Sequence, residues 1–90
     1  MPYIKAEDRY RFDDLLKTLD WNLTVGELNY FISSICHNWL RSKGVKYSNL
    51  NAVHGVLGCV DKELYRKVTG PYENEKIYEN GPVSELDSNP

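Results

Sequence analysis

The sequence lacks the short motifs that identify several large classes of enzymes. It contains no P-loop, no G-x-G-x-x-G dinucleotide motif, no G-x-S-x-G serine motif and no H-E-x-x-H zinc motif. It also lacks any run of about 20 apolar residues, the length that crosses a bilayer. We therefore expect a protein that is not an enzyme, needs no cofactor and has no membrane partner.

Basic residues are too few for a protein that binds nucleic acid. The 11 Lys and Arg are outnumbered by 13 Asp and Glu, so no positive excess is available to neutralise a phosphate backbone. The balance changes along the chain, because residues 1–70 hold ten basic and eight acidic groups whereas residues 71–90 hold one and five. This change predicts a three-helix core domain over 1–70 and an acidic C-terminal segment over 71–90, part helical and packed, with an exposed end.

Cysteine is scarce as well. Cys36 and Cys59 are the only two, and each falls inside an apolar helical pattern, which favours small core residues in a reduced protein over a disulfide scaffold. Together with His37 and His54 they are the soft metal ligands available, but no C-x-x-C or H-x₃-H pair exists. We expect no metal site, and the absence of a signal-peptide pattern predicts a location in the cytoplasm, that of a bacterial host.

Apolar periodicity predicts an all-α fold. An i, i+3, i+4, i+7 stripe at Phe12, Leu15, Leu16 and Leu19 indicates a helix that begins near Ala6. Thr24 followed three residues later by Glu27 is a capping box, and it predicts the start of a second helix. An apolar arc of about half the circumference follows on that helix, at Leu28, Phe31, Ile32, Ile35, Cys36, Trp39 and Leu40.

Glycine and proline then mark where helices end. Gly44 ends the second helix, Ser48 is the expected N-cap of a third, and Gly70-Pro71 is expected to stop it. Pro71 also suits the first turn of a short fourth helix that ends at Asn80-Gly81-Pro82. The predicted fold is a small three-helix bundle with a short C-terminal helix or extended tail.

One side of the third helix combines two glycines with polar groups. Asn51, His54, Gly55, Gly58, Lys62 and Tyr65 share one face at helical spacing. Each glycine inside a helix lowers its stability by about 1 kcal/mol relative to alanine, which indicates that another helix or a flat ligand approaches the backbone there. For a nucleotide-like ligand, the candidates for a second wall are Asn29, Ser33 and His37, or Arg66 with the segment Pro71-Tyr72-Glu73.

Aromatic residues are the other prominent feature. Seven Tyr and two Trp are numerous for so short a chain, and such side chains are enriched at protein interfaces. With the wide apolar arc of the second helix, they predict a homo-oligomer.

Several blocks of the chain resemble a known family. Residues 1–5, 27–30 and 55–57, and the stretch from Glu63 through Pro71-Tyr72-Glu73 to Asn80-Gly81, resemble an uncharacterised family of short bacterial and bacteriophage proteins. The resemblance extends from residue 1 to about 83. It implies a phage or mobile-element origin and brings no enzyme activity or established ligand.

Two functions remain open at this point. One is a non-enzymatic oligomeric binder that sequesters a nucleotide-type immune signal, by analogy with small phage proteins that counter host defence. The other is a protein–protein adaptor or inhibitor that binds a host protein through exposed aromatics and the C-terminal tail. The expected partners are copies of the chain itself with either a nucleotide-like small molecule or a host protein.

Overall fold

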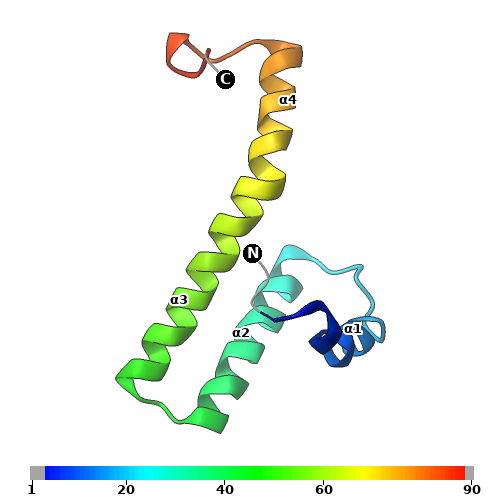
Figure 1. Cartoon of the computed structure of the whole chain (residues 1–90), viewed down its shortest axis with the longest axis vertical. Helices are drawn as coiled ribbons and strands as arrows, with labels where there is room; N and C mark the ends of the chain where they lie inside the picture. The colour runs from blue at the N-terminus through cyan, green and yellow to red at the C-terminus, as the bar shows by residue number, and fades with distance from the viewer. Residues whose placement is uncertain (1–3, 89–90) are drawn as a thin grey trace. The chain divides into compact units, whose positions relative to one another are not determined.

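A computed structural model describes residues 4–88 of the chain, and these residues form helices and turns without a strand among them (Figure 1). The all-α prediction is therefore confirmed for this part of the chain. The chain divides into two units, Met1–Asn49 and Leu50–Pro90. Packing of the helices into one bundle stays a prediction.

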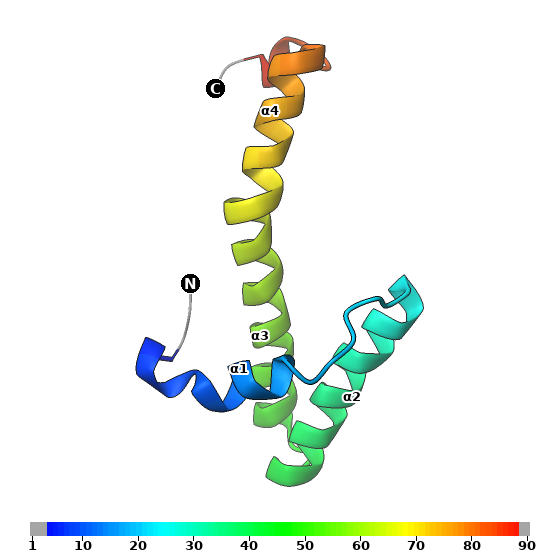
Figure 2. The ribbon, with the colours of Figure 1, turned by 90° about the vertical axis from the view of Figure 1, so that its right-hand side faces the viewer.

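The first unit begins with short helical pieces where one helix was expected. A 3-10 turn, η1 (Ala6–Asp8), precedes α1 (Tyr10–Leu16), and an irregular loop then leads into α2 (Val25–Lys43) (Figure 2). The prediction that the first helix reaches Leu19 is wrong. The hydroxyl of Thr18 donates to the Leu15 carbonyl at 2.7 Å and the Trp21 indole N–H donates to the Leu16 carbonyl at 3.3 Å. These side chains satisfy terminal carbonyls that the next helical turn would otherwise use.

The ends of α2 follow the sequence signals. The backbone N–H of Glu27 donates to Thr24 Oγ1 at 3.1 Å, and the backbone N–H of Thr24 donates to Glu27 Oε1 at 2.8 Å. Gly44 ends the helix at φ 106°, with its N–H donating to the Leu40 carbonyl at 2.7 Å. The predicted capping box and glycine terminus are both confirmed.

The next helix begins and ends differently from the prediction. It is α3 (Tyr47–Leu64), so Ser48 lies within its first turn and is not its N-cap. The predicted stop at Gly70-Pro71 is wrong, because a π-turn, η2 (Tyr65–Thr69), carries the backbone directly into α4 (Gly70–Asn80). Figure 1 shows this continuous run in yellow and orange.

The π-turn provides the physical reason why Gly70-Pro71 does not break the run. Its wider spacing lets the N–H of Gly70 donate to the Tyr65 carbonyl five residues back. An added Cβ at Gly70 would lie 3.1 Å from that carbonyl oxygen, so the bare Cα permits the approach. Pro71 then stands in the first turn of α4, a position that proline favours because its fixed φ suits a helix.

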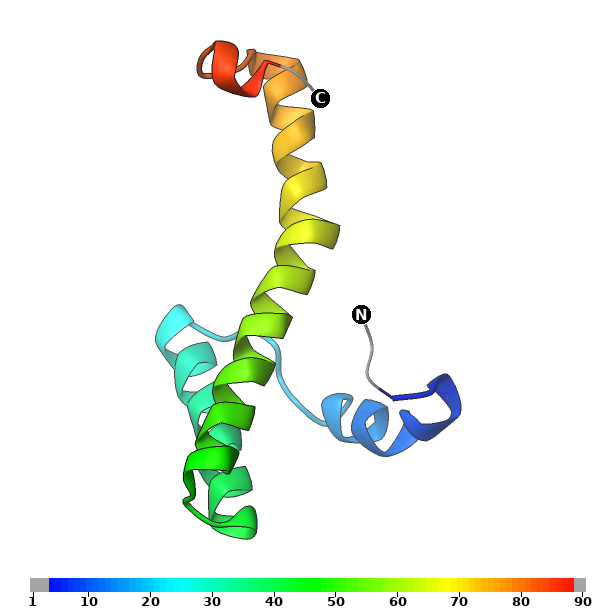
Figure 3. The same cartoon turned by 60° about the vertical axis from the view of Figure 1, so that its left-hand side comes forward.

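The C-terminal part of the second unit has a capped turn of its own. Gly81 ends α4 at φ 87°, as predicted, and η3 (Glu85–Asp87) follows. The backbone N–H groups of Ser84 and Val83 donate to the Asp87 carboxylate at 3.0 and 3.2 Å, and these bonds lower the pKa of Asp87 below its ordinary value. Figure 3 shows this turn, in red, beside the end of α4. Val83 and Leu86 are exposed.

Neither unit has a buried core of its own. No residue among 4–88 is buried, and large apolar side chains are exposed on every helix. In α2 they include Leu28, Ile32, Ile35 and Trp39, and in α3 they include Leu57, Val60 and Leu64. These faces require a further covering surface for a stable fold.

Candidate functional site

The glycine face of the third helix, Asn51, His54, Gly55, Gly58, Lys62 and Tyr65, lies on one helical run in the second unit. All six residues are exposed except Gly58, which is half-buried. Since α3 is unbroken from 47 to 64, the spacing read from the sequence does place five of them on one side of the helix. Tyr65 follows as the first residue of the π-turn.

The space in front of the two glycines is open. A Cβ added at Gly55 would meet nothing within 4 Å, and one at Gly58 would meet the Lys62 amine at 3.8 Å, an ordinary contact. No other helix of the second unit therefore requires these glycines for close packing. The face offers an imidazole, an amine and an amide around a bare stretch of backbone.

The π-turn brings Tyr65 together with a residue that the sequence did not pair with it. The Tyr65 hydroxyl donates to Glu73 Oε1 at 2.6 Å. Residues seven apart align on an α-helix, and the extra residue of the π-turn moves this alignment to eight. The hydrogen bond from the hydroxyl to the Glu73 carboxylate, and then the carboxylate's charge, raise the pKa of Tyr65 above its ordinary value.

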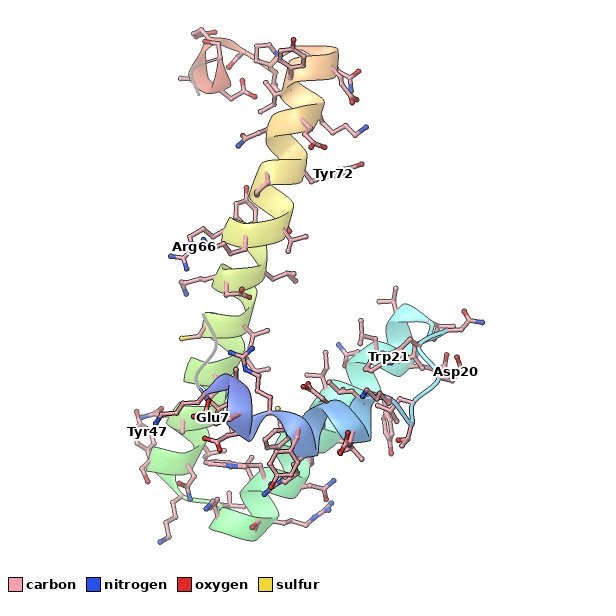
Figure 4. All side chains as sticks on the ribbon, turned by 45° about the vertical axis from the view of Figure 1, so that its right-hand side comes forward. Glu7, Asp20, Trp21, Tyr47, Arg66 and Tyr72 are labelled. Carbon is pink, nitrogen blue, oxygen red and sulfur yellow. The ribbon has the colours of Figure 1, made fainter. Side chains whose placement is uncertain are left out.

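Arg66 and Tyr72 do not form a common wall. Figure 4 shows their side chains pointing to different sides of the helical run. The ring of Tyr72 instead contacts the amine of Lys76, which lies 5.4 Å from the ring centre. The structure therefore does not bring Arg66 and Tyr72 together as one wall of a ligand site.

The remaining candidates, Asn29 and His37, lie on α2 in the first unit. Asn29 accepts a hydrogen bond from the Ser33 hydroxyl at 3.3 Å. His37 lines an open groove of about 400 Å³, here named the α2 groove. Its lining residues are Tyr30, Ser33, Ser34, His37, Asn38 and Arg41.

Sequence reasoning found only part of the α2 groove. It selected His37, Asn29 and Ser33 as polar groups on this side, but not Tyr30 or Arg41. The signal was present, because the six lining residues follow i, i+3, i+4, i+7, i+8 and i+11, a complete helical stripe.

A second open groove, of about 620 Å³, lies along α4 and beside the η3 turn. Tyr65, Glu73, Ile77 and Asp87 are among the residues that line it. No residue pattern indicates this groove, because the groove depends on the π-turn and on the Ser84–Asp87 cap that holds the last turn. Its two carboxylates are already engaged, one by the Tyr65 hydroxyl and one by backbone N–H groups.

The cysteines do not occupy a core within their units. Cys36 is half-buried, Cys59 is exposed, and both are free thiols. The prediction that Cys59 is a core residue is wrong within its unit, because the helical face that carries it has no covering element there. Among residues 4–88, no group of three or more His, Cys, Asp or Glu side chains is arranged to hold a metal ion.

Crossing a bilayer requires a helix that is both long and apolar. Over residues 4–88, no helix combines the length and the apolar character that a membrane span needs.

Comparison with known proteins gives a family without an assigned activity. The family model described as "Domain of unknown function (DUF6899)" matches residues 1–83. Neither the curated proteins nor the solved structures gave a match. The match spans both units of the structure and the whole of the glycine face and α2 groove. The chain belongs to this family of proteins that contain a domain of unknown function.

Proposed function

We propose that the protein is a non-enzymatic binding protein that works as a homo-oligomer and sequesters a nucleotide-type small molecule. The observation that carries the proposal is that none of residues 4–88 is buried, while apolar side chains are exposed on every helix. At about 25 cal/mol for each Å² removed from water, covering these faces is the main free energy available to so short a chain.

Copies of the same chain are suitable partners for these faces. The net charge is only -2, so repulsion between copies is weak. A two-fold symmetric contact places the same apolar face of both copies against each other. Each chain offers two such faces, the apolar arc of α2 and the exposed apolar side chains of α3, Leu57, Val60 and Leu64. We propose that these faces become the interior of the oligomer.

The glycine face supports the ligand part of the proposal. Gly55 and Gly58 leave backbone open to a flat ligand, with His54 and Lys62 beside it. A bound nucleotide would find donors there in His54 and Lys62, with the Asp61 carboxylate at the edge of the same face and the Glu73 carboxylate bonded to Tyr65. The proposal includes a phage origin and action in the bacterial cytoplasm, and the two free thiols are consistent with a reducing compartment.

Light scattering at several micromolar concentrations tests the assembly, with a mass of two or more chains as the expected result. A strictly monomeric mass at all concentrations would contradict the oligomer. Native mass spectrometry with a panel of linear and cyclic nucleotides then reports subunit number and ligand mass together. The variant Gly58→Leu is expected to keep the subunit number and lose the ligand mass, whereas Gly26→Leu, placed in the first turn of α2, is expected to keep both.

A second function is favoured by the C-terminal segment. Tyr78, Val83 and Leu86 are 92%, 96% and 90% exposed, and they form an apolar set near the C-terminal end of the second unit. An adaptor that binds a host protein would use such side chains as anchors. Deletion of residues 82–90 separates the two functions, since a small-ligand binder would keep its nucleotide and its subunit number, whereas an adaptor would lose its protein partner.

A further inference from the structure

Acidic residues are absent from the middle of the chain. All thirteen lie at or before Glu27 or at or after Asp61, and residues 28–60 contain none. The same middle stretch holds both histidines and three permanent cations, Arg41, Lys43 and Lys46. An acidic protein therefore carries one locally positive stretch, and α2 supplies most of it.

The α2 groove lies on the side of α2 that faces away from its apolar arc. At 100° for each residue, the stripe from Tyr30 to Arg41 is centred roughly 180° from the arc that contains Leu28, Ile35 and Trp39. A partner that covers the apolar arc therefore leaves the groove open. The groove and the proposed assembly face do not compete for the same side of the helix.

The groove is lined by hydrogen-bond donors, and the guanidinium of Arg41 is held in place. Arg41 Nη1 donates to Asn38 Oδ1 at 2.8 Å, so its partner is a neutral amide and its charge is retained. The hydroxyl of Ser34 and the ring of His37 complete the donor lining, while the Ser33 hydroxyl already donates to Asn29 Oδ1 at 3.3 Å. Arginine, hydroxyl and imidazole groups without a carboxylate among them are the donor set that binds phosphate.

Tyr30 adds a flat apolar surface at the other end of the groove. Its side chain is 75% exposed, and it stands two helical turns, about 10 Å, before His37. Exposed tyrosine rings stack on nucleobases with little dependence on base identity. The groove volume of about 400 Å³ is within the range of small-molecule sites.

From these observations we infer that the α2 groove binds a nucleoside monophosphate group, with Arg41 and His37 on the phosphate and Tyr30 against the base. The inference rests on the proposed function as a binder of nucleotide-type molecules, and it names a mononucleotide as the ligand class of a surface on α2 that is separate from the glycine face. It does not depend on the number of subunits.

A ¹⁵N NMR titration of the full chain tests the inference with three probes: AMP, inorganic phosphate and adenosine. We expect AMP to shift the backbone amides of α2 around the groove, phosphate to shift those near Arg41 and His37, and adenosine to bind most weakly. Arg41→Gln is expected to lower the AMP affinity about tenfold or more, since a charge-assisted hydrogen bond is lost.

Lys43→Gln is the matched control. It removes one positive charge from the same last turn of α2 but lies off the stripe, so the AMP affinity should change by no more than about twofold. Equal losses in the two variants would show a general charge effect and overturn the inference. AMP shifts confined to residues 51–65 would also overturn it and leave the proposed function standing, whereas no shift at either place would overturn the ligand part of both.

Discussion

Helix α2 and the run from α3 to α4 are both helical, but they differ in how their ends are determined. α2 begins at a reciprocal Thr24–Glu27 cap and stops at Gly44, where the backbone turns to positive φ. The other run passes through Gly70-Pro71, a pair that is at least as strong a stop signal in the sequence. The hydrogen-bond ladder shifts by one residue at the π-turn, and the helix continues.

The difference shows that a stop signal acts through backbone hydrogen bonds and not through residue type alone. At Gly44 the N–H still bonds the Leu40 carbonyl, but Gly44 itself leaves the helical region at φ 106°. At Gly70 the backbone stays helical at φ -58°, because the Tyr65 carbonyl accepts its N–H. A glycine ends a helix when its backbone leaves the helical region, and a proline ends one through its missing donor and the clash of its ring with the carbonyl four residues back.

The largest expected effect concerns what the two regions share, which is an exposed apolar face. Ile35→Asp places a charge in the middle of the α2 arc, where the isoleucine is 55% exposed in its unit. If copies of the chain cover this arc, the variant should lose its assembly and about 3 kcal/mol or more of unfolding free energy. Light scattering and urea unfolding at fixed protein concentration measure both quantities.

Ser33→Asp is the matched control for this change. It adds the same charge two residues earlier on the opposite, polar side of α2, so assembly should persist and stability should change by roughly 0.5 kcal/mol or less. Similar small effects in both variants would mean that the arc stays exposed, and the oligomer would then need another interface.

The capping box of α2 gives the next largest effect. Thr24→Ala removes the acceptor for the Glu27 N–H and should lower the unfolding free energy by about 1 kcal/mol, measured by urea unfolding. Thr24→Ser keeps the hydroxyl and should change the unfolding free energy by only about 0.3 kcal/mol. If both variants are equally destabilised, the threonine contributes by packing and not as a cap.

The same cap predicts a dependence on pH. The Thr24 backbone N–H donates to the Glu27 carboxylate, which lowers the pKa of Glu27 below its ordinary value of 4.5, and the Thr24 side chain lowers it further. The folded pKa lies below the unfolded one, so the stabilisation is present above the unfolded pKa and is lost as pH falls through the folded pKa. Glu27→Gln should remove this dependence.

Two glycine substitutions in the second region should have opposite signs. Gly58→Ala should stabilise by up to about 1 kcal/mol through helix propensity, because its Cβ meets only the end of Lys62 at 3.8 Å. Gly70→Ala should destabilise by about 1 kcal/mol, because its Cβ would press on the Tyr65 carbonyl at 3.1 Å in the π-turn. Thermal unfolding of the two variants measures these changes. Stabilisation at both positions would show that the helical run from α3 to α4 relaxes to an ordinary α-helix.

The smallest effect is the titration of Tyr65. Its pKa is raised above 10.0 by the Glu73 carboxylate, so an NMR titration of ¹³C-labelled tyrosine should find Tyr65 deprotonating above its ordinary pH. Glu73→Gln should return the pKa of Tyr65 toward the ordinary value, whereas Glu75→Gln should leave it unchanged. Because the pKa of Tyr65 is higher in the folded state than in the unfolded state, its hydrogen bond to Glu73 stabilises the fold at pH values below the unfolded pKa. This stabilisation is lost as pH rises through the folded pKa.

The sequence predicted helix ends correctly where the residues of the capping motif themselves make the hydrogen bonds that end the helix. Thr24 with Glu27, Gly44, and the end of α4 at Gly81 are of this kind. The prediction was wrong where the outcome depended on bonds from outside the pattern, as with Thr18 and Trp21 at the end of α1. In the candidate site, spacing alone placed the glycine face on one side of α3, but Arg41 of the α2 groove was missed, and the hydrogen bond between Tyr65 and Glu73 was not predicted.

The sequence by itself determined the all-helical class, the limits of α2 and the absence of acidic groups from residues 28–60, because periodicity, caps and charge are local properties of the chain. Only the tertiary structure decided that Gly70-Pro71 continues as a helix and that Tyr65 meets Glu73. It also decided that the chain's last turn is held by Asp87. Each of these depends on where backbone donors and carbonyls lie in space after neighbouring turns have formed, and a change of one residue in the hydrogen-bond ladder alters which side chains share a face.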